Sequence, residues 1–160
     1  MTKHRIGFGY DIHRLAEGEE LWLGGLLIPH HKGSVGHSDA DVLIHAICDA
    51  LLGAISLGDI GMHFPDTDPK WKGVDSKLLL KEVLNKVLER DYSIGNIDAT
   101  ICLEKPKLRP HIDAMRSCLA SILAIDIDDL SIKATTSEKM SFVGTEAGIK
   151  AYAVVLLYKD

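Results

Sequence analysis

Segment 39–57 constrains the fold more than any other part of the chain. Its apolar residues recur at the spacing of one helical face: Val42, Leu43, Ala46, Ile47, Ala50 and Ile55. The pattern predicts a buried helix that begins at Asp39, with Ser38 as N-cap, and ends near Leu57. A helix this apolar needs other elements to cover it, so we expect the core to form around it.

The other apolar segments predict strands and two further helices. The predicted strands are 5–12, its hairpin partner 21–28 (despite Gly24-Gly25), 97–103, 131–135 and 149–158. The further helices are predicted from Asp75 or Ser76 to Arg90 and from Pro110 to Leu123. Polar, glycine-containing loops are predicted over 30–37 and 58–73.

The order of these elements is not strict βαβ alternation. It favours an α+β fold in which a mixed β-sheet has helices packed on one face. The chain has 160 residues and no linker, so we expect one domain over 1–160. The uncovered sheet face would expose apolar side chains, which predicts oligomerisation through that face.

Composition excludes several classes of protein. The net charge of -5 argues against a nucleic-acid binder, and no apolar run is long enough to cross a membrane. The N-terminus lacks a signal-peptide core, so the expected location is cytoplasmic, or organellar if a transit peptide has been removed. Cys48, Cys102 and Cys118 are widely spaced in apolar surroundings, which predicts buried reduced thiols.

Three residues form a candidate metal site. Asp11 and His13 are two apart on a predicted strand and therefore point to the same face, and His45 lies on the apolar helix. Two imidazoles and a carboxylate suit zinc, and three protein ligands leave an open coordination position. The alternative is a strand-end Asp that caps a turn beside an exposed His.

Polar residues accompany His45 along one side of the helix. Asp41, His45 and Asp49 are four apart, and Ser38 precedes His45 by seven. When buried they need partners, so Asp49 or Asp41 is expected to accept the second ring N–H of His45. A solvated polar stripe is the alternative.

Three loops carry further candidate binding groups. Segment 58–68 has the composition of a mobile loop that covers a substrate, or of a surface turn. Segment 134–139 offers hydroxyls for phosphate and Glu138 for a hard ion such as Mg²⁺, or is a capped helix start. Segment 104–110 clusters three cations that suit a diphosphate, or is a solvated connection.

His30, His31 and Lys32 are interpreted as a surface loop without a role, and His111 as a polar residue early in a helix.

Taken together, the segments resemble the 2-C-methyl-D-erythritol 2,4-cyclodiphosphate synthase family. The matching stretches span nearly the whole chain in the order of the family: 7–13, 37–54, 58–61, 64–68 and 134–139. The resemblance implies a CMP-releasing phosphorus–oxygen lyase of the non-mevalonate isoprenoid pathway. It also implies a homotrimer whose sheets face the three-fold axis, with active sites between subunits.

The resemblance also implies the roles of individual residues. Zinc, or another divalent transition metal, maps to Asp11, His13 and His45, and a second ion, Mg²⁺ or Mn²⁺, to Glu138. His37 and Thr136 fall at the catalytic, transition-state-stabilising positions. The implied substrate-binding residues are Asp11, Ile12, His13, His37, Ser38, Asp59, Ile60, Gly61, Phe64, Pro65, Asp66, Thr67, Asp68, Leu103, Glu104, Lys105, Pro106, Lys107, Leu108, Arg109, Thr135, Thr136, Ser137, Glu138 and Phe142.

The implied partner is a small cytidine diphosphate substrate, 4-diphosphocytidyl-2-C-methyl-D-erythritol 2-phosphate. Its 2-phosphate attacks its own β-phosphorus, so the chain needs no Ser or Cys nucleophile. A metal-dependent phosphohydrolase, or a non-catalytic small-molecule-binding trimer with structural zinc, are the alternatives. The chain departs from the family pattern at Ser141, where glycine is usual, and at Thr145, where arginine often lines an axial cavity that holds isoprenoid diphosphates.

Overall fold

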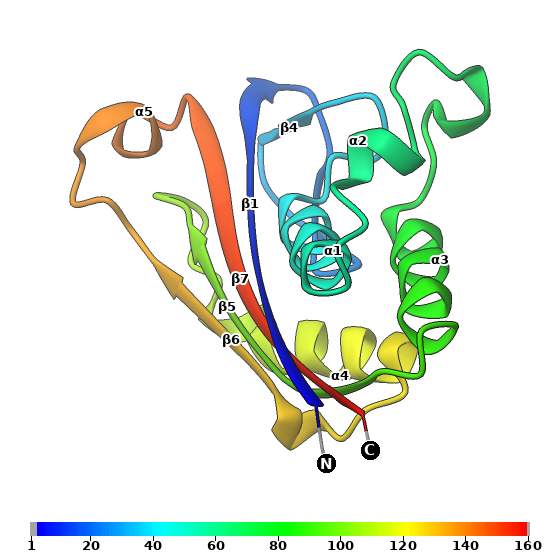
Figure 1. Cartoon of the computed structure of the whole chain (residues 1–160). Coiled ribbons are helices and arrows are strands. Elements are labelled where there is room, and N and C mark those ends of the chain that lie inside the picture. The colour runs from blue at the N-terminus through cyan, green and yellow to red at the C-terminus, as the bar shows by residue number, and fades with distance from the viewer. Residues whose placement is uncertain (1–2, 160) are drawn as a thin grey trace.

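A five-stranded sheet forms one layer of the computed structural model, which describes residues 3–159 (Figure 1). The strands lie in the order β4 (Lys32–Val35), β1 (Lys3–Glu17), β7 (Gly148–Lys159), β5 (Ser93–Cys102) and β6 (Leu130–Thr135). Only β5 and β6 pair in parallel, and the other neighbours are antiparallel. The predicted mixed sheet is confirmed. Residues 1, 2 and 160 of the predicted domain lie outside the described residues.

The long helices α1 (Val42–Ala54), α3 (Ser76–Leu88) and α4 (Ile112–Leu123) all lie on one side of this sheet (Figure 1). The short elements are α2 (Ile60–His63), α5 (Ser141–Gly144) and the 3₁₀ turns Pro69–Trp71, Arg109–His111 and Ile127–Asp129. The predicted α+β arrangement with one covered face is therefore confirmed. Across residues 3–159, no helix has the length and apolarity to cross a membrane.

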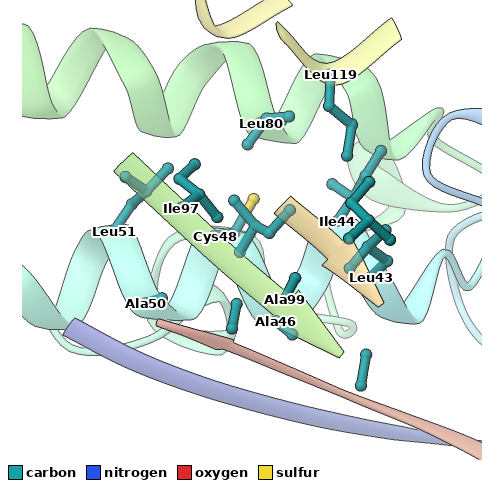
Figure 2. Packing of buried hydrophobic residues seen from close by; sticks show 14 of the residues in the cluster. Leu43, Ile44, Ala46, Cys48, Ala50, Leu51, Leu80, Ile97, Ala99 and Leu119 are labelled. Carbon is teal, nitrogen blue, oxygen red and sulfur yellow. The ribbon is translucent and has the colours of Figure 1, made fainter. Parts of the chain in front are cut away.

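Helix α1 is the centre of the core, as its pattern predicts. Figure 2 shows its side chains packed between the strands and the other helices, with Leu80 of α3 and Leu119 of α4 nearby. Gly7 and Gly9 of β1 let the helix lie directly on the strand. A Cβ atom on Gly9 would lie 1.8 Å from the carbonyl oxygen of Ala46, and one on Gly7 equally close to that of Ala50. No side chain fits between β1 and α1 at these positions.

Segment 21–28 does not pair with β1, contrary to prediction. It folds on itself as a separate hairpin of β2 (Leu21–Leu23) and β3 (Leu26–Ile28). Gly24 and Gly25 form the turn, with backbone φ angles of 59° and 79°, and their N–H groups donate to Asp41. β1 pairs instead with β7 and with β4, which lies inside the predicted 30–37 loop.

Helix α1 begins three residues later than predicted. Asp41 rather than Ser38 is its N-cap, because the Asp41 carboxylate accepts the N–H of Ile44. The predicted 58–73 loop contains α2 and a 3₁₀ turn. The three cysteines are free thiols as predicted, although Cys118 is only partly buried.

The opposite face of the sheet is apolar and exposed. Alternate residues of β1 point away from the helices, and Ile6 and Phe8 are 74% and 61% exposed. Tyr10, Ile12 and Val154 are also exposed. A soluble monomer rarely leaves so much contiguous apolar surface in water.

Candidate active site

Asp11, His13 and His45 converge where β1 meets α1. The Asp11 Oδ2 atom lies 2.9 Å from His13 Nε2 and 3.0 Å from His45 Nδ1, and the two nitrogens are 3.2 Å apart. Ligands on a tetrahedral zinc ion lie about 3.3 Å from one another, given bonds of about 2.0 Å. The three donors therefore have the spacing and chemistry that fit a divalent transition metal, and the predicted cluster is confirmed as a group.

Hydrogen bonds on the far side of each ring fix which nitrogen faces the cluster. His13 Nδ1 lies 3.1 Å from the carbonyl oxygen of Val35, which must accept its proton. His45 Nε2 lies 3.0 Å from the Ser76 hydroxyl and 3.2 Å from that of Ser38. Each ring therefore turns a lone pair toward the cluster, as a metal ligand must.

Ser76, which the sequence did not single out as a site residue, orients His45. Its hydroxyl donates to Asp39, so its oxygen is left to accept from the His45 ring. Asp39 also accepts the backbone N–H of Ser76. The expectation that Asp41 or Asp49 supports His45 is wrong, because neither carboxylate reaches the ring.

Asp41 and Asp49 organise the surrounding backbone instead. Asp41 is fully buried and accepts three N–H groups, those of Gly24, Gly25 and Ile44. Asp49 accepts the N–H of Ile60 at 2.8 Å and so anchors α2 beside the cluster. The polar residues of α1 are structural partners rather than a solvated stripe.

The electrostatics of the cluster favour a charged Asp11. Burial raises its pKa, but hydrogen bonds from His13 and His45 outweigh burial and lower the pKa to about 2. Burial lowers the pKa of His13, but the hydrogen bond and negative charge of Asp11 overcome this and raise it. In the absence of metal, the charged Asp11 and the raised pKa of His13 favour an ion pair between these two side chains.

The cluster lies in a pocket of about 400 Å³. The other predicted site residues that line it are His37, Ser38, Ile60, Gly61, Phe64, Pro65 and Asp66. Trp71, Val74 and Leu79 also line it and were not predicted. The Trp71 ring meets Phe64 edge-on, with centroids 4.9 Å apart, so that the two aromatics form an apolar wall.

A second pocket, of about 370 Å³, lies beside β6 and contains most of the remaining predicted residues. Those residues are Leu103, Glu104, Pro106, Lys107, Leu108, Arg109, Thr135 and Thr136. Lys133 and Ile132 join them. The predicted catalytic pair is thereby divided, with His37 in the first pocket and Thr136 in the second.

Eight predicted residues line neither pocket: Ile12, Asp59, Thr67, Asp68, Lys105, Ser137, Glu138 and Phe142. Asp59 and Asp68 cap short helical turns, and Lys105 pairs with Glu146. Glu138 is exposed, and its carboxylate oxygen lies 3.3 Å from the Thr136 hydroxyl. Ser141, at the usual glycine position, has a left-handed φ of 58°, which explains why glycine suits that position.

Comparison with known proteins gives the family. Residues 4–158 match the model of the YgbB family. The chain belongs to this family. A relative from Bacteroides fragilis named 2-C-methyl-D-erythritol 2,4-cyclodiphosphate synthase is 59% identical over 155 residues, which are 97% of this chain and 98% of the relative. The predicted family and enzyme are confirmed, and the phosphohydrolase alternative gains no support.

Solved structures of other proteins are similar along nearly the whole chain. The bifunctional IspDF protein of Campylobacter jejuni matches with a TM-score of 0.96 and 39% identity. The match covers 100% of this chain and 43% of that longer protein. A 2C-methyl-D-erythritol-2,4-cyclodiphosphate synthase in a CDP-bound form matches with a TM-score of 0.89 and 42% identity, over 96% of this chain and 99% of that one.

Proposed function

We propose that this protein is a 2-C-methyl-D-erythritol 2,4-cyclodiphosphate synthase of the non-mevalonate isoprenoid pathway. It converts 4-diphosphocytidyl-2-C-methyl-D-erythritol 2-phosphate to the cyclic diphosphate and CMP. The observation that carries the proposal is the Asp11–His13–His45 cluster, set in a pocket lined by residues of the family-matching segments 37–38, 60–61 and 64–66.

Zinc is the metal that we propose for the cluster. When bound, it would act as a Lewis acid on a substrate phosphate and help to hold two mutually repelling anionic groups together. The chain contributes the preset geometry, because Val35 and Ser76 fix the two imidazole rings. The absence of a cysteine ligand and the three-donor set favour a catalytic ion over a structural one.

The reaction needs positioning more than a protein nucleophile. An oxygen of the 2-phosphate bonds to the β-phosphorus, and the bond from that phosphorus to the bridging oxygen breaks, so that CMP leaves with the electron pair. We propose that His37 stabilises the charge on the transferred phosphoryl group from the first pocket. Phe64 and Trp71 keep water from the methylerythritol end, which limits hydrolysis.

The cytidine end is proposed to bind in the second pocket. Lys107 and Arg109 supply positive charge there, and Thr136 supplies a hydroxyl. Glu138 offers a carboxylate at the rim for Mg²⁺ or Mn²⁺, which takes its other ligands from phosphates and water. Among residues 3–159, Glu138 belongs to no group of three or more metal-ligating side chains, so we propose that the substrate completes that site.

One complete active site then requires two subunits. β1, which carries Asp11 and His13, is separated from β6 by β7 and β5 in the sheet, so the two pockets of one chain lie apart. We propose a homotrimer in which the exposed faces around Phe8 turn toward the three-fold axis. This packing covers the apolar surface and brings the second pocket of one subunit to the metal cluster of its neighbour.

The deciding experiment follows the products. Zinc-loaded protein is given the cytidine substrate with Mg²⁺, and phosphorus NMR is recorded. We expect CMP and a cyclic diphosphate without inorganic phosphate. Inorganic phosphate would indicate the phosphohydrolase, and unchanged substrate would indicate a binding protein; either result overturns the proposal.

Two variants locate the activity. His45→Asn removes a proposed metal ligand and is expected to lower zinc content and turnover together. Ser117→Ala changes an exposed residue of α4, away from the cluster and from the exposed sheet face, and is expected to leave both unchanged. Full turnover in His45→Asn would exclude the cluster as the active site.

A further inference from the structure

A second group of metal-ligating side chains lies away from both pockets. His30, His31 and Glu146 each place one ligand atom within 4.8 Å of the others. The two rings are 4.3 Å apart between centroids. Within residues 3–159, this group and the Asp11 cluster are the two groups of three or more ligating side chains close enough to share an ion.

The backbone that carries these residues is fixed on both sides. The carbonyl oxygen of His31 accepts the N–H of Gly18, just beyond the end of β1. On the other side, the carbonyl oxygen of Ala147 accepts the N–H of Leu15, and the N–H of Glu146 donates to Val143. The loop before β4 and the loop before β7 are therefore both fastened at one end of β1, which holds in place the backbone that carries the three ligands.

A ring nitrogen of His30 remains without a partner. Its Nε2 atom is buried and makes no hydrogen bond in the described chain. An imidazole nitrogen that no protein group engages can serve as a metal ligand through its lone pair.

One cation already competes for this position. The Lys105 ammonium lies 3.2 Å from the Glu146 carboxylate, while Lys32 donates to the Glu146 carbonyl. The Lys105 side chain is 66% exposed, so it can turn into solvent at little cost. A divalent ion held by two imidazoles and a carboxylate would replace that single charge.

We propose that His30, His31 and Glu146 form a second divalent transition-metal site, distinct from the Asp11–His13–His45 cluster. Two imidazoles with one carboxylate select Zn²⁺, Co²⁺, Ni²⁺ or Cu²⁺ over the oxygen-preferring Mg²⁺ and Ca²⁺. The site ties the loop before β4 to the loop before β7. It does not depend on the proposed function, because it shares no residue with either pocket.

Metal counting on the intact protein tests the proposal. The protein is stripped with a chelator, dialysed, and titrated with Co²⁺ and Zn²⁺, with uptake followed by visible absorption and calorimetry. We expect two equivalents per chain in the wild type and one in the His30→Asn/His31→Asn double variant. His45→Asn, which removes a ligand of the first cluster, is expected to retain one equivalent at the second.

Two more variants keep the result interpretable. Glu146→Gln preserves shape if the double histidine change impairs folding, and it should also lose one equivalent. Lys105→Ala removes the competing ammonium and should tighten the second equivalent by about two- to five-fold. His4→Asn is the matched control and should bind two. One equivalent in the wild type, or two in the double variant, would overturn the proposal.

Discussion

The hydroxyl oxygen of Ser76 lies 3.0 Å from Nε2 of His45. This contact joins the first residue of α3 to a proposed metal ligand on α1, and Asp39 holds the hydroxyl from behind. The hydrogen bonds from Asp39 through Ser76 to His45, rather than a residue of the metal cluster, therefore determine that Nδ1 of His45 faces Asp11. The precision of the site therefore depends on how α1 and α3 pack.

Ser76→Ala should weaken metal binding without removing a ligand. The His45 ring loses the nearer of its two hydroxyl partners and keeps only Ser38, so its orientation is less well fixed and we expect zinc affinity to fall about 10- to 100-fold. Competition with a chromophoric chelator measures the change. Ser117→Ala, on the exposed side of α4, is the control and should match the wild type. An unchanged zinc affinity in Ser76→Ala would contradict the claim that Ser76 orients the His45 ring.

Gly9→Ala should prevent α1 from docking on β1. The added Cβ would lie 1.8 Å from the Ala46 carbonyl oxygen, which is backbone and cannot move aside, so we expect a loss of more than about 3 kcal/mol. The free energy of unfolding in urea measures it. Gly53→Ala, at an exposed α1 position with open space around it, should instead add about 0.5–1 kcal/mol. Similar effects at both positions would refute the close approach.

Phe8→Glu should break the proposed trimer. It places a charge on the exposed sheet face, where its neighbours are also apolar, and burying that charge at a subunit contact is costly. Light scattering coupled to size-exclusion chromatography should find a monomer. Leu27→Glu changes a similarly exposed residue on the β3 hairpin and should remain trimeric. A trimeric Phe8→Glu protein would place the interface elsewhere.

The stability of the metal-free protein should pass through a maximum in mildly acidic solution. The lowered pKa of Asp11 means that its ionised carboxylate stabilises the folded protein above pH 3.8, and this stabilisation is lost as the pH falls toward about 2. The raised pKa of His13 means that its protonated ring stabilises the folded protein below pH 6.5, and this stabilisation is lost as the pH rises through the pKa of the folded state. Urea midpoints measured in EDTA from pH 3 to 9 test this. His13→Asn should flatten the alkaline side, and an identical profile in that variant would contradict it.

The local spacing of residues in the sequence was enough to predict most of the helices and strands and the Asp11–His13–His45 cluster. The period of α1 and the i, i+2 spacing of Asp11 and His13 depend only on backbone geometry, which the sequence determines directly. The pairing of segment 21–28 was predicted wrongly because Gly24-Gly25 forms a turn that Asp41 stabilises from a distant position. No spacing rule links Ser76 to His45, or His31 to Glu146.

The sequence by itself determined the spacing of apolar side chains along each helix and strand, the family, and the metal-ligating residues of the Asp11 cluster. Tertiary structure alone decided which groups orient those donors, and it divided His37 and Thr136 between two pockets. It also brought His30 and His31 beside Glu146. The physical reason is that side-chain period is a local property of the chain. Contacts between residues 31 and 115 positions apart, such as His45 with Ser76 or His31 with Glu146, exist only after the helices and loops have packed around β1.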